Sequence, residues 1–196
     1  MILGLTGAFG GGKSTVLHYF EEKGWYTFDA DAACHKLYDA AIPELIDKVK
    51  ELFGNSAVRP DNTIDRGVIA QAAFAHPEKM KLLTGTLYPL LTKNMIDTIA
   101  RCRSGKRHGI FELPLLYEGG FENHFDAVLA LWTDPELRKL RLRNRNYSAD
   151  DMAKRDARQL PPEEKLERAD FAVINNGSPE MLFEQLDKLI ELLKNK

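Results

Sequence analysis

The sequence has little cysteine, no excess of charge of one sign and no long hydrophobic run. Its two cysteines, Cys34 and Cys102, lie far apart and form no Cys-x-x-Cys pair. We therefore expect neither a thiolate metal site nor a disulfide scaffold. The expected setting is the reducing cytoplasm. Lysine and arginine number 27 against 29 acidic residues, a net charge of −2. A chain so balanced does not attract nucleic acid or an anionic membrane as a whole, so any anion site must be built locally.

The sequence also shows no pattern of a membrane span or of a signal peptide. No run of about 18 apolar residues occurs, and the N-terminal segment lacks the basic and apolar regions of a secretory signal. Hydrophobic residues make up 44% of the 196 residues, enough for a globular domain with a sizeable core. Nothing in the composition indicates an obligate protein partner.

Short apolar runs alternate with helical patterns along most of the chain. Continuous apolar runs, rather than alternating ones, are typical of parallel strands buried on both faces. We therefore predict an α/β fold, a three-layer core around a five-stranded parallel sheet. The expected strands are residues 2–5, 25–28, 108–113, 127–133 and 171–174. Helices are expected over residues 13–23 and after Ser178-Pro179, where leucines recur at helical spacing.

Residues 41–103 carry helical patterns and no good strand. Pro43 opens an amphipathic helix that Gly54 closes, Asp65 can cap a second helix, and Pro77 opens a third. This block is long for one crossover, so we expect a helical insertion that forms a smaller lobe. The charged, helix-prone residues 137–168 are expected to form a lid. The core is then expected at residues 1–40, 104–136 and 169–196.

Residues 7–14 fit the phosphate-loop pattern G-x-x-x-x-G-K-[ST]. Glycine lets the backbone N–H groups approach a polyphosphate, and the helix that follows points its positive end at the anion. Lys13 is expected to reach the β- and γ-phosphates, and the Ser14 hydroxyl is expected to ligate Mg²⁺. The motif indicates a nucleoside triphosphate but does not say which reaction follows.

The chain carries no base-recognition or switch motif of a GTPase, which leaves a small phosphotransferase. Asp29 and Asp31 end the second expected strand, at the edge where parallel sheets bind ligands. A carboxylate there can accept a proton from an alcohol or hold Mg²⁺ through water. One of the two can instead cap the helix expected over residues 32–38, and Asp31 is the better placed for that.

Five cations crowd residues 138–145, with no acid between them. At helical spacing Arg138, Arg141 and Arg145 share one face. Like charges on one face repel, so this pattern favours an anionic partner, as in charge neutralisation on a transferred phosphoryl group. The alternative is a solvated basic helix.

Taken together, these segments resemble the dephospho-CoA kinase family, P-loop enzymes that phosphorylate the ribose 3′-hydroxyl of dephospho-CoA with ATP. The resemblance runs nearly from end to end. Its motifs are G-L-T-G-A-F-G-G-G-K-S-T at Gly4–Thr15, F-D-A-D at Phe28–Asp31, D-N-T-I-D-R at Asp61–Arg66, L-P-L-L-Y-E at Leu113–Glu118, R-x-x-x-Q at Arg155–Gln159, A-D at Ala169–Asp170 and N-N-G at Asn175–Gly177.

The resemblance implies ATP and Mg²⁺ as cofactors and ATP and dephospho-CoA as substrates. It implies Asp31 as base or acceptor-orienting carboxylate, with Lys13 and Arg141 acting on the transferred group. Magnesium would be held by Ser14, with Asp31 or Glu112 acting through water. The residues implied for ATP are Gly7, Ala8, Phe9, Gly10, Gly11, Gly12, Lys13, Ser14, Thr15, Arg145, Asn175 and Gly177. Those implied for the acceptor are Asp29, Asp31, Arg66, Tyr88, Pro114, Leu115, Leu116 and Glu118.

Three positions depart from the family's usual pattern. Tyr88 stands before Pro89 in place of a histidine, although tyrosine can still donate a hydrogen bond. Asn62 replaces a glycine. Glu112 is more acidic than expected at the end of its strand, where it can orient water on Mg²⁺ or simply be solvated. Two alternatives remain open for the whole chain: another small-molecule or nucleotide kinase of this fold, and a nucleotide-gated binding module without catalysis.

Overall fold

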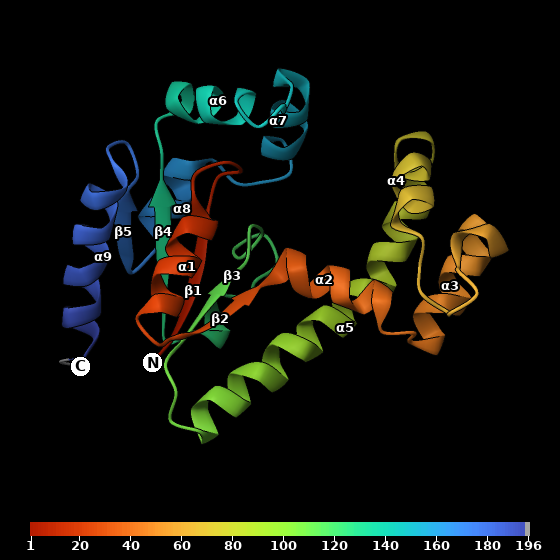
Figure 1. Cartoon of the computed structure of the whole chain (residues 1–196), viewed down its shortest axis with the longest axis horizontal. Coiled ribbons are helices and arrows are strands. Elements are labelled where there is room, and N and C mark those ends of the chain that lie inside the picture. The colour runs from red at the N-terminus through yellow and green to blue at the C-terminus, as the bar shows by residue number, and fades with distance from the viewer. Residues whose placement is uncertain (195–196) are drawn as a thin grey trace. The chain divides into compact units, whose positions relative to one another are not determined.

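The structure, a computed structural model, describes residues 1–194 (Figure 1). The chain divides into two compact units, one formed by Met1–Asp29 with the chain from Ile99 onward, the other by Ala30–Thr98. None of the helices described for these residues has both the length and the apolar composition needed to cross a bilayer.

The first unit is built on a parallel sheet. Within the described residues its strands are β1 Ile2–Gly7, β2 Tyr26–Asp29, β3 Gly109–Glu112, β4 Ala127–Trp132 and β5 Phe171–Ile174. The order is β2-β3-β1-β4-β5, and every neighbouring pair is parallel. The α/β fold and the five-stranded parallel sheet predicted from the sequence are confirmed, and the strand ends lie within two residues of those predicted.

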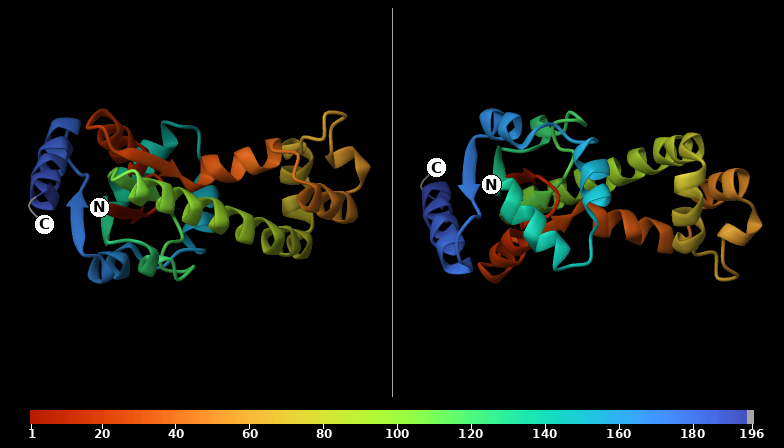
Figure 2. Two further views of the ribbon diagram at one scale, coloured as in Figure 1. Left: turned by 90° about the horizontal axis from the view of Figure 1, so that it is seen from below. Right: turned by 90° about the horizontal axis from the view of Figure 1, so that it is seen from above.

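Helices cover both faces of this sheet, which is why its central strands are largely apolar. All six residues of β1 are buried. On one face, α1 Lys13–Glu22 and α9 Pro179–Lys194 share a hydrophobic cluster with the strands, with Phe20 and Leu186 fully buried in it. On the other, α8 Pro162–Arg168 contacts β4 and β1. Figure 2 shows α1 and α8 on opposite sides of the strands.

The segment expected as a lid contains separate helices because local signals interrupt it. Helix α6 Pro135–Arg143 begins at Asp134, whose side chain accepts from the backbone N–H groups of residues 136 and 137 at 2.9 and 3.1 Å. Helix α7 Ala149–Asp156 begins with a capping box between Ser148 and Asp151. Pro161 and Pro162 then force a new start for α8.

The second unit is helical. It contains α2 Ala30–Asp39, α3 Pro43–Phe53, the 3₁₀ turn η1 Asn55–Ala57, α4 Arg66–Ala75 and most of α5 Pro77–Ser104, while the 3₁₀ turn η2 Glu122–His124 belongs to the first unit. The helix starts predicted at Pro43 and Pro77 are confirmed, as is the cap at Asp65, which accepts from the N–H groups of residues 67 and 68.

The expected insertion begins at residue 41, whereas this unit begins at Ala30. The difference has a packing cause. Leu37 and Tyr38 of α2 are buried in the same hydrophobic cluster as Leu45 of α3 and Leu83 of α5. Helix α2 therefore packs within the helical unit.

Two leucines of α9 test the packing of the first unit. Leu186 is fully buried, whereas Leu192 on the same helix is 60% exposed. We expect Leu186→Ala to lower the free energy of unfolding by about 2–5 kcal/mol, because it removes buried methyl groups and leaves a cavity. Leu192→Ala should change it by less than about 0.5 kcal/mol. Urea unfolding followed by circular dichroism measures both, and equal effects would contradict this packing.

Candidate active site

The loops and side chains that could bind phosphate or take part in catalysis gather at one edge of the sheet. In a parallel sheet the carboxyl ends of the strands lie together, and here β1 runs into the phosphate loop, β3 ends at Glu112, β4 leads to Thr133 and β5 leads to Asn175. These four strands are neighbours in the order β3-β1-β4-β5. Loops that are far apart in the sequence therefore meet around residues 7–14.

Glycine is required in the phosphate loop for two distinct reasons. Gly12, the residue before α1, has φ of 102°, a conformation that side chains rarely adopt, and a Cβ there would collide with Asn175. Gly10 has φ of 77°, and a Cβ there would lie 2.5 Å from the side chain of Leu142 on α6. The loop is thus closely packed on its outer side. The N–H groups of Thr15 and Val16 bond the Gly12 carbonyl, while those of Lys13 and Ser14 precede the first intrahelical bond and suit an anion.

The carbonyl of Gly11 is held from two sides. The Thr133 hydroxyl and the Asn175 side-chain amide each donate a hydrogen bond to it at 2.8 Å, and both side chains are buried. In a trans peptide the C=O of one residue and the N–H of the next point in opposite directions. Fixing the Gly11 carbonyl outward therefore turns the Gly12 N–H toward the inside of the loop.

Lys13 lies folded over the loop. Its side chain is 7% exposed, and its ammonium donates to the carbonyls of Gly7 and Ala8 at 3.1 and 3.2 Å. The Glu112 carboxylate lies 3.4 Å from the same nitrogen. Glu112 is itself buried, so the interpretation as a solvated strand end is wrong. A buried carboxylate therefore lies beside the lysine at the place where phosphates are expected.

Oxygen donors suited to a hard cation stand at the same edge. Asp29 of β2 pairs in register with Glu112 of β3, so both carboxylates start from the same face of the sheet. Ser14 lies in the first turn of α1 and is exposed. Hydroxyl and carboxylate oxygens are the ligands that Mg²⁺ accepts, usually with several waters retained. The donor set therefore fits a magnesium ion.

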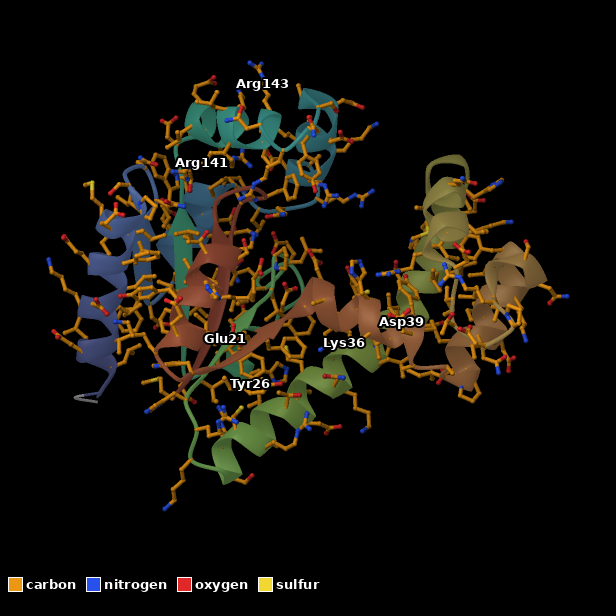
Figure 3. All side chains as sticks on the ribbon, viewed as in Figure 1. Glu21, Tyr26, Lys36, Asp39, Arg141 and Arg143 are labelled. Carbon is orange, nitrogen blue, oxygen red and sulfur yellow. The ribbon has the colours of Figure 1, made fainter. Side chains whose placement is uncertain are left out.

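The arginines of α6 have different roles. Arg141 projects toward the sheet and Arg143 away from it (Figure 3), and the Arg141 guanidinium donates to the Asn175 carbonyl at 2.9 Å. Arg138 is buried, donates to both oxygens of Asp156 at 2.7 and 2.8 Å, and also bonds the Phe9 carbonyl. The expected repulsion among three like charges is therefore wrong for Arg138, whose charge Asp156 neutralises.

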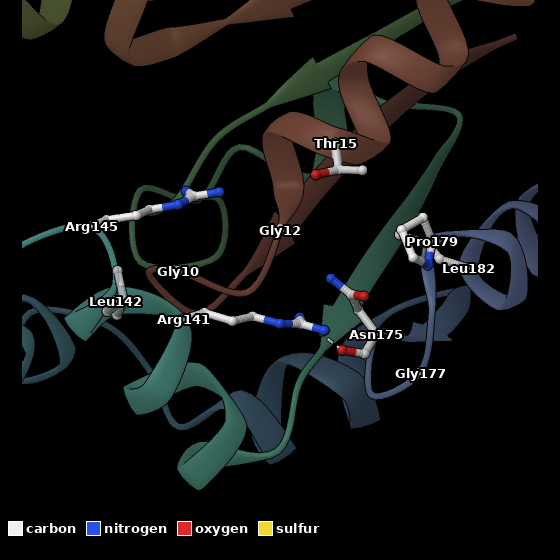
Figure 4. A pocket seen from close by; sticks show the side chains of 10 residues that line it. All are labelled: Gly10, Gly12, Thr15, Arg141, Leu142, Arg145, Asn175, Gly177, Pro179 and Leu182. Atoms are coloured by element: carbon white, nitrogen blue, oxygen red, sulfur yellow. Dashed lines mark hydrogen bonds between the residues drawn. The ribbon is translucent and has the colours of Figure 1, made fainter.

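A pocket of about 190 Å³ lies between the phosphate loop, α6 and the start of α9 (Figure 4). The three residues expected at ATP from the later parts of the chain, Arg145, Asn175 and Gly177, all line it. The sequence analysis missed its apolar members Leu142, Pro179 and Leu182, since Pro179 indicated only a helix start and Leu182 only packing. The lining residues are Gly10, Gly12, Thr15, Arg141, Leu142, Arg145, Asn175, Gly177, Pro179 and Leu182.

Phe9 links the loop to α7. Its ring packs edge-on against Tyr147 with centroids 5.1 Å apart, and the Arg155 guanidinium lies 4.3 Å from the Phe9 centroid. An arginine over an aromatic face is attracted by the ring's quadrupole. The second variable position of the phosphate loop is therefore a contact for the lid segment.

The segment after β3 is a mixture of core and surface. Leu116, expected at the acceptor, is fully buried beside Gly4 and Phe125, so its side chain belongs to the core. Pro114 and Leu115 are half-buried. The Glu118 carboxylate, also expected at the acceptor, accepts from the Leu160 backbone N–H at 2.6 Å. It also pairs with Lys165 of α8, a buried residue that the sequence analysis did not single out because it lies in the charged, helix-prone stretch expected as a lid.

Of the remaining acceptor residues, Asp29 ends β2 in the first unit, and the others belong to the second unit. Helix α2 begins at Ala30, so Asp31 lies in its first turn and is not its cap, and Asp29 is the residue before the helix. Arg66 is the first residue of α4 and is exposed. Tyr88 on α5 is 46% exposed. Asp31, Arg66 and Tyr88 are exposed, whereas Asp29 is half-buried.

Comparison with known proteins identifies the family. The family model described as dephospho-CoA kinase matches residues 1–180. The chain belongs to the dephospho-CoA kinase family. A dephospho-CoA kinase of Corynebacterium glutamicum is 33% identical over 96% of this chain and 94% of its own length. Among solved structures, a Thermus thermophilus protein has a TM-score of 0.79 at 29% identity, covering 98% of this chain and 97% of its own.

A dephospho-CoA kinase of Campylobacter jejuni has a TM-score of 0.77 at 25% identity, covering 98% of this chain and 96% of its own. Membership of the family makes the chain a kinase, a transferase of coenzyme A biosynthesis. Kinases with a phosphate loop of this kind use ATP. The resemblance inferred from the motifs is confirmed.

The hold on the Gly11 carbonyl can be tested at Thr133. Thr133→Val keeps the shape of the side chain and removes its hydroxyl, so one of the two hydrogen bonds at 2.8 Å is lost. We expect the Kd for a non-hydrolysable ATP analogue to rise about five- to tenfold, the value of one buried hydrogen bond. Isothermal titration calorimetry measures this, with Thr133→Ser, which keeps the hydroxyl, as the matched control. Equal affinities for all three proteins would show that this bond does not shape the loop.

Proposed function

We propose that this kinase transfers the γ-phosphoryl group of Mg²⁺-bound ATP to the ribose 3′-hydroxyl of dephospho-CoA. The family match over residues 1–180 carries the proposal, because the fold alone suits many acceptors. The phosphate loop supports it, since its backbone is fixed by side chains from two further strands.

In this mechanism the loop amides and Lys13 bind the phosphates. Arg141 and Arg145 of the pocket neutralise the charge that develops on the phosphoryl oxygens. Ser14 holds the metal, and Glu112 or Asp31 acts on it through water. When bound, Mg²⁺ supplies positive charge to the phosphate oxygens.

Asp31 serves as the base or as the carboxylate that orients the acceptor hydroxyl. A carboxylate in hydrogen-bond reach of the hydroxyl can take its proton during transfer. Asp29, Arg66 and Tyr88 are proposed to contact the acceptor, together with the exposed parts of Pro114 and Leu115. Tyr88 supplies a phenolic donor at the position where the family usually has histidine.

An acceptor panel tests the substrate. ADP release is followed by a coupled assay with dephospho-CoA, nucleoside monophosphates, shikimate and gluconate as acceptors. We expect turnover with dephospho-CoA alone. Turnover with another acceptor and none with dephospho-CoA would favour a different small-molecule kinase. ATP binding without ADP release from any acceptor would favour a binding module without catalysis.

Removal of the phosphate-loop lysine should abolish transfer. We expect Lys13→Ala to lower kcat by about 10³-fold or more, because the lysine charge is aimed at oxygens that gain charge in the transition state. Steady-state kinetics measures this, and circular dichroism at 25 °C should show an unchanged fold. Unchanged turnover would remove Lys13 from the mechanism.

Two aspartates of α2 offer a matched comparison. Asp31 and Asp39 are both exposed and lie in the first and last turns of the same helix. We expect Asp31→Asn to lower kcat by about 10²- to 10⁴-fold, the range for loss of a general base, with little change in the KM for ATP. Asp39→Asn should behave as the wild type. If the two variants are equally active, Asp31 has no part in proton transfer.

A further inference from the structure

Lys165 of α8 is buried beside the active site, and the mechanism above does not use it. Its side chain is 1% exposed, although lysine is almost never fully buried unless its charge is paired. Burying a cation carries a large desolvation cost, so its surroundings must compensate it. The arrangement of those partners shows what the residue does.

Three acceptors surround the Lys165 ammonium. It donates to the Pro114 carbonyl at 2.6 Å and to the Gln159 side-chain oxygen at 3.2 Å, and it pairs with the Glu118 carboxylate at 2.9 Å. An ammonium group has three N–H donors. These partners therefore satisfy all of them, and the geometry suits a residue that holds protein segments together rather than one that contacts a substrate.

Glu118 completes the connection. The carboxylate oxygen that pairs with Lys165 also accepts the Leu160 backbone N–H at 2.6 Å. Lys165 and Glu118 thus join two segments, the loop of residues 113–121 after β3 and the turn of residues 157–161 between α7 and α8. We call this pair and its hydrogen bonds the Lys165–Glu118 clasp.

The clasp rests on a fixed base. Helix α8 is attached to the sheet, because the Trp132 indole donates to Glu163 at 3.2 Å. At the other end of the helix Arg168 pairs with Glu122 at 2.9 Å. Any movement of residues 113–121 must therefore break the clasp or shift a helix that the sheet holds in place.

The clasp also lies within the field of the phosphate loop. The pKa of Lys165 is lowered, first by burial and also by the charge of Lys13, while the hydrogen bond and charge of Glu118 raise it. Lys13 in turn is balanced by Glu112. Each of these two buried lysines is therefore paired with its own glutamate.

We propose that Lys165 is a positioning residue that, through the Lys165–Glu118 clasp, holds residues 113–121 in the conformation that binds the acceptor. This inference rests on the proposed function, in which residues 114 and 115 contact dephospho-CoA. The clasp itself is a property of the chain and can be measured without any acceptor.

Kinetics of four variants tests the role. Lys165→Met removes the charge and nearly preserves the side-chain length, Glu118→Gln removes the partner's charge, the double variant completes a cycle, and Lys165→Arg restores a cation. We expect Lys165→Met to lower kcat/KM for dephospho-CoA about 30- to 100-fold, mainly through KM, because a misplaced binding loop loses orientation. The KM for ATP should change by less than about threefold. Lys165→Arg should recover about tenfold of the loss, since arginine supplies the same charge.

The double variant should be no worse than the poorer single variant, because both changes break one unit. Lys188→Met on α9, an exposed lysine, is the matched control and should behave as the wild type. Equal losses for ATP and dephospho-CoA in Lys165→Met, without recovery in Lys165→Arg, would reduce the residue to a structural role and overturn the proposal.

Hydrogen exchange provides the readout that needs no acceptor. The Gly119 and Phe121 N–H groups are hydrogen-bonded to the carbonyls of Leu115 and Leu116 at 3.0 and 2.9 Å. We expect peptides spanning residues 113–121 to exchange faster in Lys165→Met and Glu118→Gln, while β1 and α1 remain protected. Unchanged exchange in both variants would overturn the clasp. If the loop loosens but the wild type phosphorylates a different acceptor, the clasp stands and the substrate proposal fails.

Discussion

The orientation of one peptide unit, Gly11–Gly12, is the constraint on which the site depends. A phosphate can be bound by backbone N–H groups only if the opposing carbonyls are turned away and satisfied elsewhere. Here Thr133 and Asn175 satisfy the Gly11 carbonyl, and they follow β4 and β5 respectively. Those side chains reach the loop because the sheet order places β1 beside β4 and β4 beside β5. Phosphate binding is in this sense a property of the strand order as much as of the glycine-rich motif.

The buried cations of the first unit are each paired with one acidic side chain. Three buried cations each have a specific acid: Lys13 has Glu112, Lys165 has Glu118 and Arg138 has Asp156. Burying such a pair costs desolvation free energy, which offsets the attraction between the charges, so the pair adds little to stability. Once the pair is formed, separating its partners leaves an uncompensated charge, and this fixes their geometry. Arg141 and Arg145 line the pocket instead. The near-neutral composition of the chain therefore conceals a locally positive site, which is what a kinase that binds several phosphates needs.

The sequence was sufficient where the determining signal is local. Continuous apolar runs predicted the strands, and Pro43, Asp65 and Pro77 predicted helix starts, since each acts within a turn of its own position. Roles that depend on distant partners could not be predicted. Arg138 looked like one of three free arginines until Asp156, from another helix, was seen to neutralise it. Lys165 lies in a charged, helix-prone stretch that carries no signal of burial, and its burial depends on the loop after β3. Helix α2 was assigned to the core because its contacts with α3 and α5 leave no mark on its own pattern.

Asn175 contacts both the phosphate loop and α6, one through its side chain and the other through its backbone. Its side chain holds the Gly11 carbonyl, while its backbone carbonyl accepts from Arg141 of α6. A hydrogen bond from arginine to a neutral carbonyl is weaker than one to a phosphate oxygen, which carries charge and can accept in bidentate fashion. Anionic oxygens in the pocket therefore compete favourably for Arg141, and the exchange leaves the Asn175 side chain in place. We propose that α6 follows the phosphates in this way without disturbing the peptide that binds them. The pairing of Arg138 with Asp156 joins α6 to α7, and Arg155 joins α7 to Phe9 of the phosphate loop.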